Sequence, residues 1–462
     1  MHLSGRILLG GLCLSLVIAT FVCGYGWLNL GTRWWFEDDP MQVAFVAGLP
    51  NVWAVLYDPK VASGFGAGNA LAPLLILSFA FDLHLGGAHP AVFYLHNVAL
   101  TAAVVVSFFL VLCQQVSRTG VSFLAAILFL YSPATLVLLQ YVSARHYLQG
   151  ALAFLLVVGA SQSRARWAFP GLVVCAVLGL MTKELWAALI LTYLFVHGVS
   201  SGRRGLMVLS ILLAGIYFLY RSYLLGIDLG YQAKPPSLFD FWHFLGVIPY
   251  GVTANRAGFL VLGGLIFVLG WLGGRGRLSG FGREHWSWGI LLAVSVGVLL
   301  PVSHSILVTY IEPNPWYRVF IGFNIIAGIL LVRLCLVARL PRLYSIGVAA
   351  ILTIGIAYGA HKTRVWWLER SGELERAGRF IHENPTKVLY TEDLAFWFLP
   401  GVERLYGLPE GRFLNPYFER FAADRAKVDA STDLYREREG AIVPAPEKRG
   451  ELIATRTGKG FP

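Results

Sequence analysis

The sequence predicts an α-helical polytopic membrane protein with about eleven transmembrane helices and a small C-terminal extracytoplasmic α/β domain. Three observations predict this fold class: the composition, the number of long apolar segments and the placement of the arginines. Of the 462 residues, 56% are hydrophobic and 14% are charged, whereas an ordinary soluble domain carries roughly 25% charged residues. The composition therefore excludes a disordered chain and an ordinary soluble enzyme.

The apolar segments give the number of spans. A helix that crosses the hydrocarbon core needs roughly 20 mostly apolar residues. About eleven segments qualify, and they lie near residues 7–30, 92–113, 121–140, 146–160, 168–182, 184–199, 206–225, 256–272, 286–308, 317–336 and 343–361. No small-residue cleavage site follows the first of them, so we expect it to remain as a span rather than to be removed as a signal peptide.

The arginines give the orientation. Alternate loops of this map hold twelve arginines and one acidic residue, Glu284, whereas the other loops are nearly balanced in charge. Cytoplasmic loops carry an excess of Lys and Arg, so these loops and the N-terminus are predicted to be cytoplasmic and the C-terminus extracytoplasmic. The net charge of +11 then reflects topology rather than a nucleic-acid surface. A bacterial inner membrane is the expected location.

Two outer loops are long, over residues 31–91 and 226–255. The first contains an apolar stretch, Leu71–Phe81, that is too short to cross a membrane. The second contains an aromatic, amphipathic segment over 238–245 that predicts an interfacial helix. We expect a transmembrane domain over 1–361 and a C-terminal domain over 362–462. The latter is predicted to contain a helix over 368–382, a short strand over 387–391 and a disordered end.

The first outer loop opens with three aromatic residues and three carboxylates, Trp34-Trp35-Phe36-Glu37-Asp38-Asp39-Pro40. Aromatic rings anchor at the membrane interface, and carboxylates beside lipid are costly enough to indicate function. Asp39 has an alternative role as a helix cap, because Pro40 and Gln42 follow it at capping-box positions. Asp38 is then the best candidate for a general base, with Glu37 beside it. A solvated loop is the alternative for all three.

A second candidate, Thr182-Lys183-Glu184, lies between two apolar runs on the predicted outer face. A Lys–Glu pair in this position is typical of two situations. Lys183 and Glu184 either contact a substrate or neutralise each other where two helices meet. The sequence leaves both interpretations open.

A third candidate is Arg318, which follows two prolines in Glu312-Pro313-Asn314-Pro315-Trp316-Tyr317-Arg318. The prolines predict an extended loop. The planar guanidinium suits a phosphate at headgroup depth, and snorkelling to lipid phosphates is the alternative. Arg145 and His146 are weaker candidates at an outer helix end.

The motifs identify no certain cofactor. The five cysteines lie in or beside apolar runs without a CxxC pair, so neither a disulfide framework nor a zinc site is expected. No P-loop and no GxGxxG occurs, which leaves ATP-driven transport without support. Three adjacent acidic residues keep a divalent metal, Mg²⁺ or Mn²⁺, open as a cofactor.

In the order of these segments the chain resembles the C-type (GT-C) membrane glycosyltransferases. This family includes the protein O-mannosyltransferases and the aminoarabinose transferase of lipid A. The resemblance covers roughly residues 1–330. Its motifs, in chain order, are Glu37-Asp38-Asp39-Pro40, Ala72-Pro73-Leu74, His89-Pro90, Phe93-Tyr94-Leu95-His96-Asn97-Val98, Leu130-Tyr131-Ser132-Pro133, Ser143-Ala144-Arg145, Thr182-Lys183-Glu184 and Pro315-Trp316-Tyr317-Arg318.

The resemblance implies a sugar donor linked to polyprenyl phosphate, an active site at the outer membrane face, and a lipid, glycan or protein acceptor. It implies that Asp38 or Asp39 acts as base or positions the acceptor, that Arg318 holds the lipid phosphate, and that Lys183 assists. The other candidates for substrate binding are Glu37, Glu184, Arg145 and His146. A transporter or lipid flippase, a lipid-linked polysaccharide polymerase or ligase, and a non-catalytic scaffold are the competing interpretations.

Overall fold

The computed structural model describes residues 11, 14–15, 34–65, 71–116, 118–163, 165, 167–226, 287–298, 315–337, 342–384, 386–390, 398–408, 413–414, 433–438 and 441–446. The chain divides into two compact units. Unit 1 comprises Met1–Leu28, Trp53–Leu77 and Tyr94–Val365, and unit 2 comprises Asn29–Val52, Ser78–Phe93 and Trp366–Pro462. Unit 2 thus combines two segments of the predicted first outer loop with the C-terminal residues, a grouping that differs from the expected division at residue 361.

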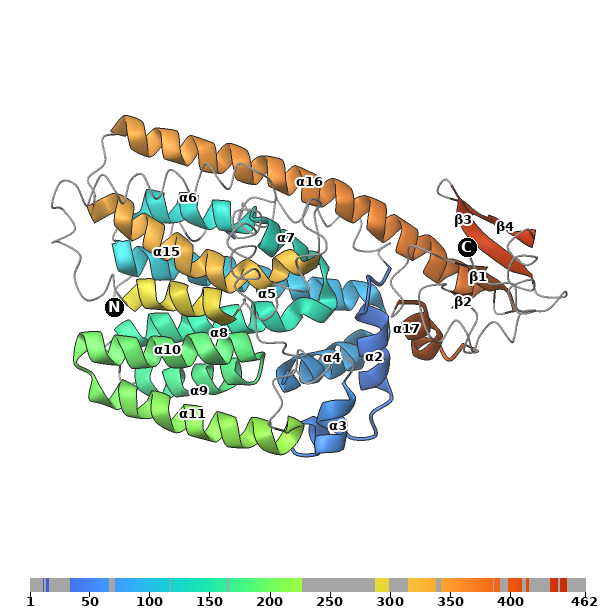
Figure 1. Ribbon diagram of the computed structural model, residues 1–462, viewed down its shortest axis with the longest axis horizontal. Coiled ribbons are helices and arrows are strands. Elements are labelled where there is room, and N and C mark those ends of the chain that lie inside the picture. The colour runs from blue at the N-terminus through green and yellow to red at the C-terminus, as the bar shows by residue number, and fades with distance from the viewer. Residues whose placement is uncertain are drawn as a thin grey trace, which may run out of the picture. The chain divides into compact units, whose positions relative to one another are not determined.

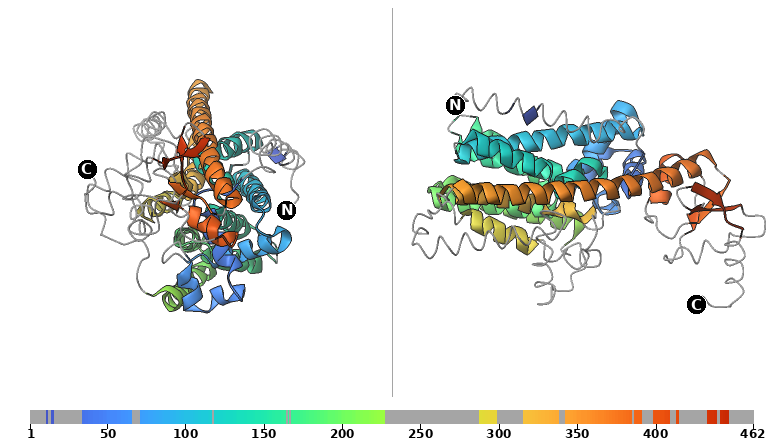
Figure 2. Two further views of the ribbon diagram at one scale, coloured as in Figure 1. Left: turned by 90° about the vertical axis from the view of Figure 1, so that its right-hand side faces the viewer. Right: turned by 90° about the horizontal axis from the view of Figure 1, so that it is seen from above.

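Unit 1 is a bundle of apolar helices (Figure 1). Figure 2 shows the bundle helices side by side in two further views. Its helices are α3 (Pro59–Gly64), α5 (Pro90–Val116), α6 (Thr119–Leu130), α7 (Pro133–Gln140), α8 (Arg145–Gln162), α9 (Ala168–Leu180), α10 (Glu184–Ser201), α11 (Arg204–Leu225) and α15 (Ile321–Val337), with the 3-10 turns η2 (Val52–Leu56), η3 (Val142–Ala144) and η5 (Pro315–Phe320). Helices α4 (Pro73–Gly86), α5 and α16 (Arg342–Glu383) contribute residues to both units.

Five of the spans expected from the sequence, near 92–113, 121–140, 146–160, 184–199 and 206–225, correspond to described helices, whereas α9, at the span expected near 168–182, has 13 residues and is too short to cross alone. Within the described residues, four helices are long and apolar enough to cross a membrane, and a fifth span results if the bent pair α6 and α7 is one span. Helix α4 has 14 residues and is too short, as expected for its segment. The expected span near 7–30 lies outside the described residues except for 11, 14 and 15, and the expected span near 256–272 and the expected interfacial helix over 238–245 lie wholly outside them.

One expected span is broken. Ser132 is the N-cap of α7 and accepts a hydrogen bond from the Thr135 N–H, and Pro133 begins the helix. Proline suits the first turn of a helix but breaks a helix interior. The sequence Tyr131-Ser132-Pro133 therefore ends α6 and starts α7 at an angle of 56°.

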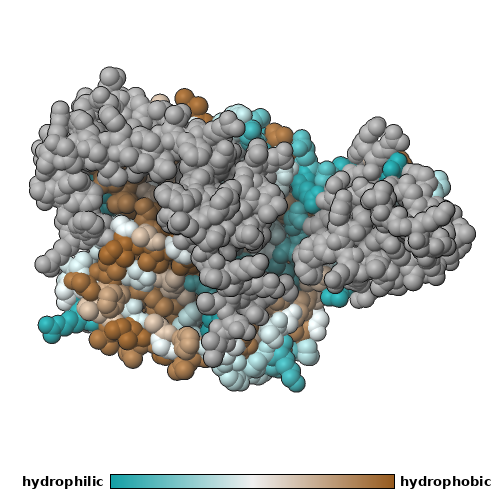
Figure 3. Space-filling view, in the orientation of Figure 1, coloured by the Kyte–Doolittle hydropathy of each residue, from teal (hydrophilic) through white to brown (hydrophobic). Residues whose placement is uncertain are grey.

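The outer surface of the bundle is apolar. Helix α11 exposes a row of large side chains, and that surface is brown in Figure 3. The row comprises Val208, Ile211, Leu212, Ile216, Phe218 and Leu219. Contiguous apolar patches of this kind are rare on soluble monomers, whereas lipid tails cover them without cost. The surface therefore supports a helical membrane protein.

The interior of the bundle depends on close approach at a few glycines. Gly150 on α8 faces Trp186 on α10, and a Cβ at Gly150 would lie 2.0 Å from the Trp186 ring. The Trp186 side chain is fully buried. Because a methyl group cannot fit there, the two helices can pack at this distance only with glycine at position 150.

Unit 2 combines a four-stranded sheet with short helices. The strands are β1 (Val388–Tyr390), β2 (Phe413–Leu414), β3 (Leu434–Arg438) and β4 (Ala441–Pro444), in the order β2-β1-β3-β4. Strand β1 is parallel to β2 and β3, with Val388 opposite Leu434, and β3 and β4 are antiparallel. The strand expected over 387–391 is confirmed, and the helix expected over 368–382 is the C-terminal part of α16.

The remaining helices of unit 2 are α2 (Asp39–Ala47) and α17 (Phe398–Leu405), which pack against each other. Their contact again requires a glycine, because a Cβ at Gly401 would lie 2.3 Å from the backbone nitrogen of Met41. The tight packing of α17 fixes the position of α2, whose first residue is Asp39.

We predict that Gly150→Ala destabilises the protein by about 1–3 kcal/mol, because the added methyl group overpacks the contact with Trp186. Gly171→Ala on α9 is the matched control, since a Cβ there meets nothing within 4 Å and alanine has the higher helix propensity. Thermal unfolding in detergent measures both. A midpoint for Gly150→Ala equal to that of Gly171→Ala would contradict the packing described.

Candidate functional site

The residues singled out from the sequence fall into two groups. The acidic segment, residues 37–39, lies in unit 2. The cationic cluster, which comprises Arg145, Lys183 and Arg318, lies in unit 1 together with His146 and Glu184.

The acidic segment starts from a strained backbone. Glu37 has a φ of +44°, a left-handed conformation that is uncommon outside glycine. Its carboxylate accepts a hydrogen bond of 3.0 Å from the Nε–H of Arg370 on α16, and Arg370 also donates to Glu373 at 3.2 Å. The ion pair compensates for the unfavourable backbone conformation and orients the loop.

The charge of Arg370 is secured by these two carboxylates. Burial alone would lower the pKa of the guanidinium, but Glu37 and Glu373 together raise it above its ordinary value. Arg370 and Glu37 are both largely shielded from solvent, with side-chain exposures of 18% and 16%. The pair therefore fixes the acidic segment more firmly than an exposed ion pair would.

The two aspartates have different environments. Asp39 is fully buried, and its carboxylate accepts a hydrogen bond of 3.4 Å from the Phe36 N–H. Asp38 is half-buried, and its carboxylate accepts a hydrogen bond of 2.7 Å from the Gln42 amide. Helix α2 begins at Asp39 and has Asp38 as N-cap without a side-chain cap bond. The cap expected at Asp39 is therefore displaced by one residue, and the Gln42 side chain bonds to the Asp38 carboxylate instead of capping.

The cationic cluster assembles around residues 141–147. The Arg318 guanidinium lies 4.7 Å from the centre of the Tyr141 ring, and the Lys183 ammonium lies 4.8 Å from the centre of the Tyr147 ring. Lys183 and Arg318 both act electrostatically on His146, whose ring nitrogens are buried. Three segments far apart in the sequence thus bring their cations to the N-terminus of one helix, α8.

The local structure explains how these cations are placed. Residues 315–320 form the 3-10 turn η5 rather than the expected extended segment, because proline is also suited to the first residue of a helix. Turn η5 packs against α7, and Arg318 lies on it. Lys183 is the N-cap of α10 and adopts an extended backbone.

Arg145 is held by a residue that the sequence reasoning did not single out as functional. Arg145 is fully buried, and its Nε–H donates to the Asn97 amide oxygen at 2.7 Å. The Asn97 amide nitrogen donates to the carbonyls of Leu138 and Tyr141 at 3.1 and 3.2 Å. Asn97 is thus satisfied on both sides of its amide. A polar residue in the apolar helix α5 was the signal that could have identified it.

Glu184 has structural partners. Its Oε1 accepts hydrogen bonds from the Leu71 N–H at 3.0 Å and from the Arg221 Nε–H at 3.4 Å. The contacts join α10 to the chain before α4 and to the end of α11. Of the two interpretations left open for Lys183 and Glu184, this geometry favours an ion pair at helix ends, but with Arg221 as the partner of Glu184.

The part of the chain that the structure describes offers no evident metal site. Among the residues that the structure describes, no group of three or more His, Cys, Asp or Glu side chains could hold one. Glu37 and Asp39 are bonded to Arg370 and to the Phe36 backbone. The divalent metal therefore stays an open prediction.

Comparisons with known proteins agree with the fold. No protein-family model and no curated protein sequence matches the chain. Two solved structures are similar: ArnT from Cupriavidus metallidurans in the apo state, with a TM-score of 0.54, and the same protein bound to undecaprenyl phosphate, with a TM-score of 0.49. Each is 12% identical and covers 95% of this chain and 94% of its own. ArnT is an aminoarabinose transferase of the GT-C superfamily. The apo structure confirms, at the level of the fold, the resemblance inferred from the sequence.

We predict that Asn97→Ala destabilises unit 1, because it leaves two buried carbonyls and the Arg145 Nε–H without their partner, at about 1–3 kcal/mol for each group. Asn97→Asp keeps the acceptor for Arg145 and should cost less. Ser122→Ala is the control, since it removes a neutral hydroxyl that donates to the Arg118 carbonyl. Thermal unfolding in detergent should rank Asn97→Ala as the least stable of the three.

We further predict that Glu37→Gln lowers the stability by about 1–3 kcal/mol, the usual range for a shielded hydrogen bond to a charged group. Glu375→Gln is its match, because Glu375 also accepts from an arginine of α16 but in an exposed pair, worth about 0.5 kcal/mol or less. Chemical denaturation of both variants, of Arg370→Gln, and of Glu37→Gln combined with Arg370→Gln gives the coupling energy of the Glu37–Arg370 pair. Additive effects of the two substitutions would show that the pair contributes nothing.

Proposed function

We propose that the protein is a membrane glycosyltransferase that moves a sugar from a polyprenyl-phosphate donor to an acceptor at the outer face of the membrane. The single observation that carries the proposal is the convergence of Lys183 and Arg318 on the segment 141–147, where Arg145 and His146 begin α8. The GT-C-like fold supports it.

The chemistry of the donor requires positive charge. When the bond between the anomeric carbon and the phosphate oxygen breaks, its electron pair stays on the lipid phosphate, whose negative charge grows. Arginine and lysine stabilise such a leaving group through charge-assisted hydrogen bonds. The N-terminus of α8 adds the positive end of a helix dipole. In our proposal Arg318 and Lys183 bind the phosphate, and Arg145 and His146 complete its surroundings.

The acceptor requires a base. Its hydroxyl oxygen attacks the anomeric carbon, and the proton passes to a carboxylate. Asp38 is the candidate for this role. Its side chain is only half-buried, and it lies on a segment that the Glu37–Arg370 pair orients. Asp39 is fully buried and bonded to the loop backbone, so its proposed role is to hold the segment. Direct attack on the donor inverts the anomeric configuration and forms no covalent intermediate with the enzyme.

The proposal predicts two separable losses. Asp38→Asn should reduce sugar transfer by about 100-fold or more, the contribution expected of a general base, while binding of polyprenyl phosphate stays unchanged. Arg318→Gln and Lys183→Gln should each weaken binding of polyprenyl phosphate by about tenfold, the effect of losing roughly 1.4 kcal/mol. Transfer by purified protein from a panel of polyprenyl-phosphate sugars, with and without EDTA, measures the first effect, and titration with polyprenyl phosphate measures the second.

The control variant is Arg221→Gln, which removes a cation of unit 1 that pairs with Glu184 and should leave the affinity for polyprenyl phosphate unchanged. Unchanged transfer by a folded Asp38→Asn/Asp39→Asn double variant would overturn the role of the acidic segment. Movement of the intact donor across vesicles without transfer would identify a transporter instead. Loss of transfer in EDTA, restored by Mg²⁺ or Mn²⁺, would establish a metal requirement.

A further inference from the structure

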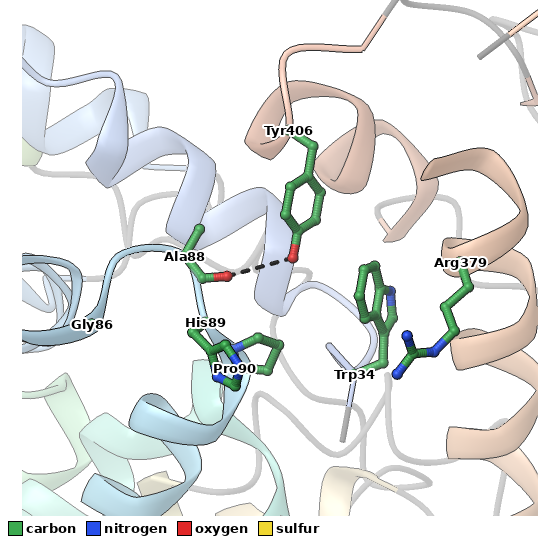
Figure 4. Close-up of a pocket in the computed structure, with 7 residues that line it drawn as sticks. All are labelled: Trp34, Gly86, Ala88, His89, Pro90, Arg379 and Tyr406. Atoms are coloured by element: carbon green, nitrogen blue, oxygen red, sulfur yellow. Dashed lines mark hydrogen bonds between the residues drawn. The ribbon is translucent and has the colours of Figure 1, made fainter. Parts of the chain in front are cut away.

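Unit 2 contains a cavity of about 530 Å³, and one of its lining residues, Trp34, lies just before the acidic segment in the chain (Figure 4). This volume lies within the usual range of roughly 300–1,000 Å³ for small-molecule sites. Its walls come from four parts of unit 2: the chain before α2, the turn between α4 and α5, the end of α16 and the end of α17. The lining includes Trp34, Ala88, His89, Arg379 and Tyr406.

One wall is a rigid aromatic surface. The rings of Trp34 and Tyr406 are stacked, with centroids 5.6 Å apart and an angle of 18°. The Trp35 indole N–H donates to the Tyr406 hydroxyl at 3.0 Å, and this hydroxyl donates to the Ala88 carbonyl at 3.5 Å. Burial raises the pKa of Tyr406, so the phenol is neutral and able to donate. A Cβ at position 378 would lie 2.2 Å from the Trp34 nitrogen, so Gly378 leaves room for the ring.

The other functional wall carries the Arg379 guanidinium, which is paired with Glu375. The Arg379 guanidinium lies 5.0 Å from the centre of the Trp34 ring, and its Nε–H donates to Glu375 at 2.8 Å. That bond and the contact with the Trp34 ring together position the guanidinium. Figure 4 shows Trp34 between Tyr406 and Arg379, with His89 across the cavity. His382 lies beside both aromatic rings.

The combination of these walls selects a class of ligand. Aromatic surfaces bind the apolar faces of sugar rings, while tyrosine, histidine and backbone carbonyl groups bind hydroxyls. A planar guanidinium binds a carboxylate or a phosphate through paired N–H donors. A neutral lipid would satisfy the rings but not the guanidinium, and a bare anion would not use the rings.

From this geometry we infer that the cavity is a binding subsite for an acidic saccharide, with Arg379 on the anionic group and the Trp34–Tyr406 pair against the sugar ring. The inference rests on the proposed function, because the chain that forms the aromatic wall at Trp34 continues directly into the carboxylates at 37–39. A saccharide held there is the acceptor, and the subsite makes an acidic sugar unit the preferred one.

Direct titration of the full-length protein in detergent tests the inference without requiring transfer. The probes are trigalacturonic acid, which carries carboxylates, glucosamine 6-phosphate, which carries a phosphate, maltotriose, which is neutral, and inorganic phosphate. We expect at least one acidic saccharide to bind about tenfold or more tightly than maltotriose, and inorganic phosphate to bind weakly. The ratio between the two acidic probes identifies carboxylate or phosphate as the recognised group.

The variants assign the binding to this cavity. Arg379→Gln should abolish the preference for acidic probes, whereas Arg376→Gln, the same change on the same helix outside the cavity lining, should keep it. Trp34→Phe retains a ring and should bind the acidic probes more weakly than the native protein. Equal binding of acidic and neutral saccharides, or an acidic preference that Arg379→Gln leaves intact, overturns the inference.

A second readout separates this inference from the proposed function. Hydrolysis of a polyprenyl-phosphate sugar in the absence of acceptor reports the donor site alone, and Arg379→Gln should leave it unchanged while it raises the KM for an acidic acceptor about tenfold. If hydrolysis and transfer are both absent in the native protein but acidic saccharides bind as expected, the proposed function fails and the subsite stands as a saccharide site. If transfer occurs with a KM that Arg379→Gln does not change, the function stands and the subsite fails.

Discussion

The buried guanidinium of Arg145 is the constraint on which the arrangement of unit 1 depends. A charged group without exposed surface is stable in a bundle of apolar helices only if polar partners surround it. Asn97 on α5 provides one such partner and also binds the carbonyls at the end of α7. Three helices are therefore fixed to one another at the start of α8. The break at Ser132-Pro133 makes this possible, since a straight helix would not present its C-terminal carbonyls at that position.

Unit 2 uses a comparable solution around the acidic segment. Glu37 adopts a backbone conformation that few residues other than glycine adopt, and its pairing with Arg370 compensates for it. The neighbouring aromatic side chains of the same segment pack into the unit. The ring centroids of Phe36 and Trp367 lie 3.7 Å apart. In both units, then, a charged or strained residue is kept in place by partners that are far away in the sequence.

The sequence identified most of the helices and the chemical groups, but not their partners. Apolar length predicted α5, α10 and α11 within a few residues, because the bilayer dictates length and polarity directly. The cations at 145, 183 and 318 were visible as charges next to apolar runs. The partners of Glu37, Glu184 and Arg145 were not predictable, because each pair joins residues 37 or more positions apart and one sequence contains no information about such pairing. The prediction of an extended segment at Pro315 was wrong for a local reason, because proline is compatible with both an extended chain and a helix start.

The exposed apolar row of α11 has a consequence for how this sequence can vary. A core side chain must match the shape of its neighbours, as Trp186 matches Gly150, whereas lipid tails adapt to any apolar shape. At Val208, Ile211 and Leu219 exchange among apolar residues is therefore nearly neutral, while a single charge is not. The lipid-facing positions of α11 are constrained in polarity but hardly in shape. Distant relatives should therefore differ there in residue identity while remaining equally apolar. Sequence identity alone will underestimate how closely such proteins share a fold.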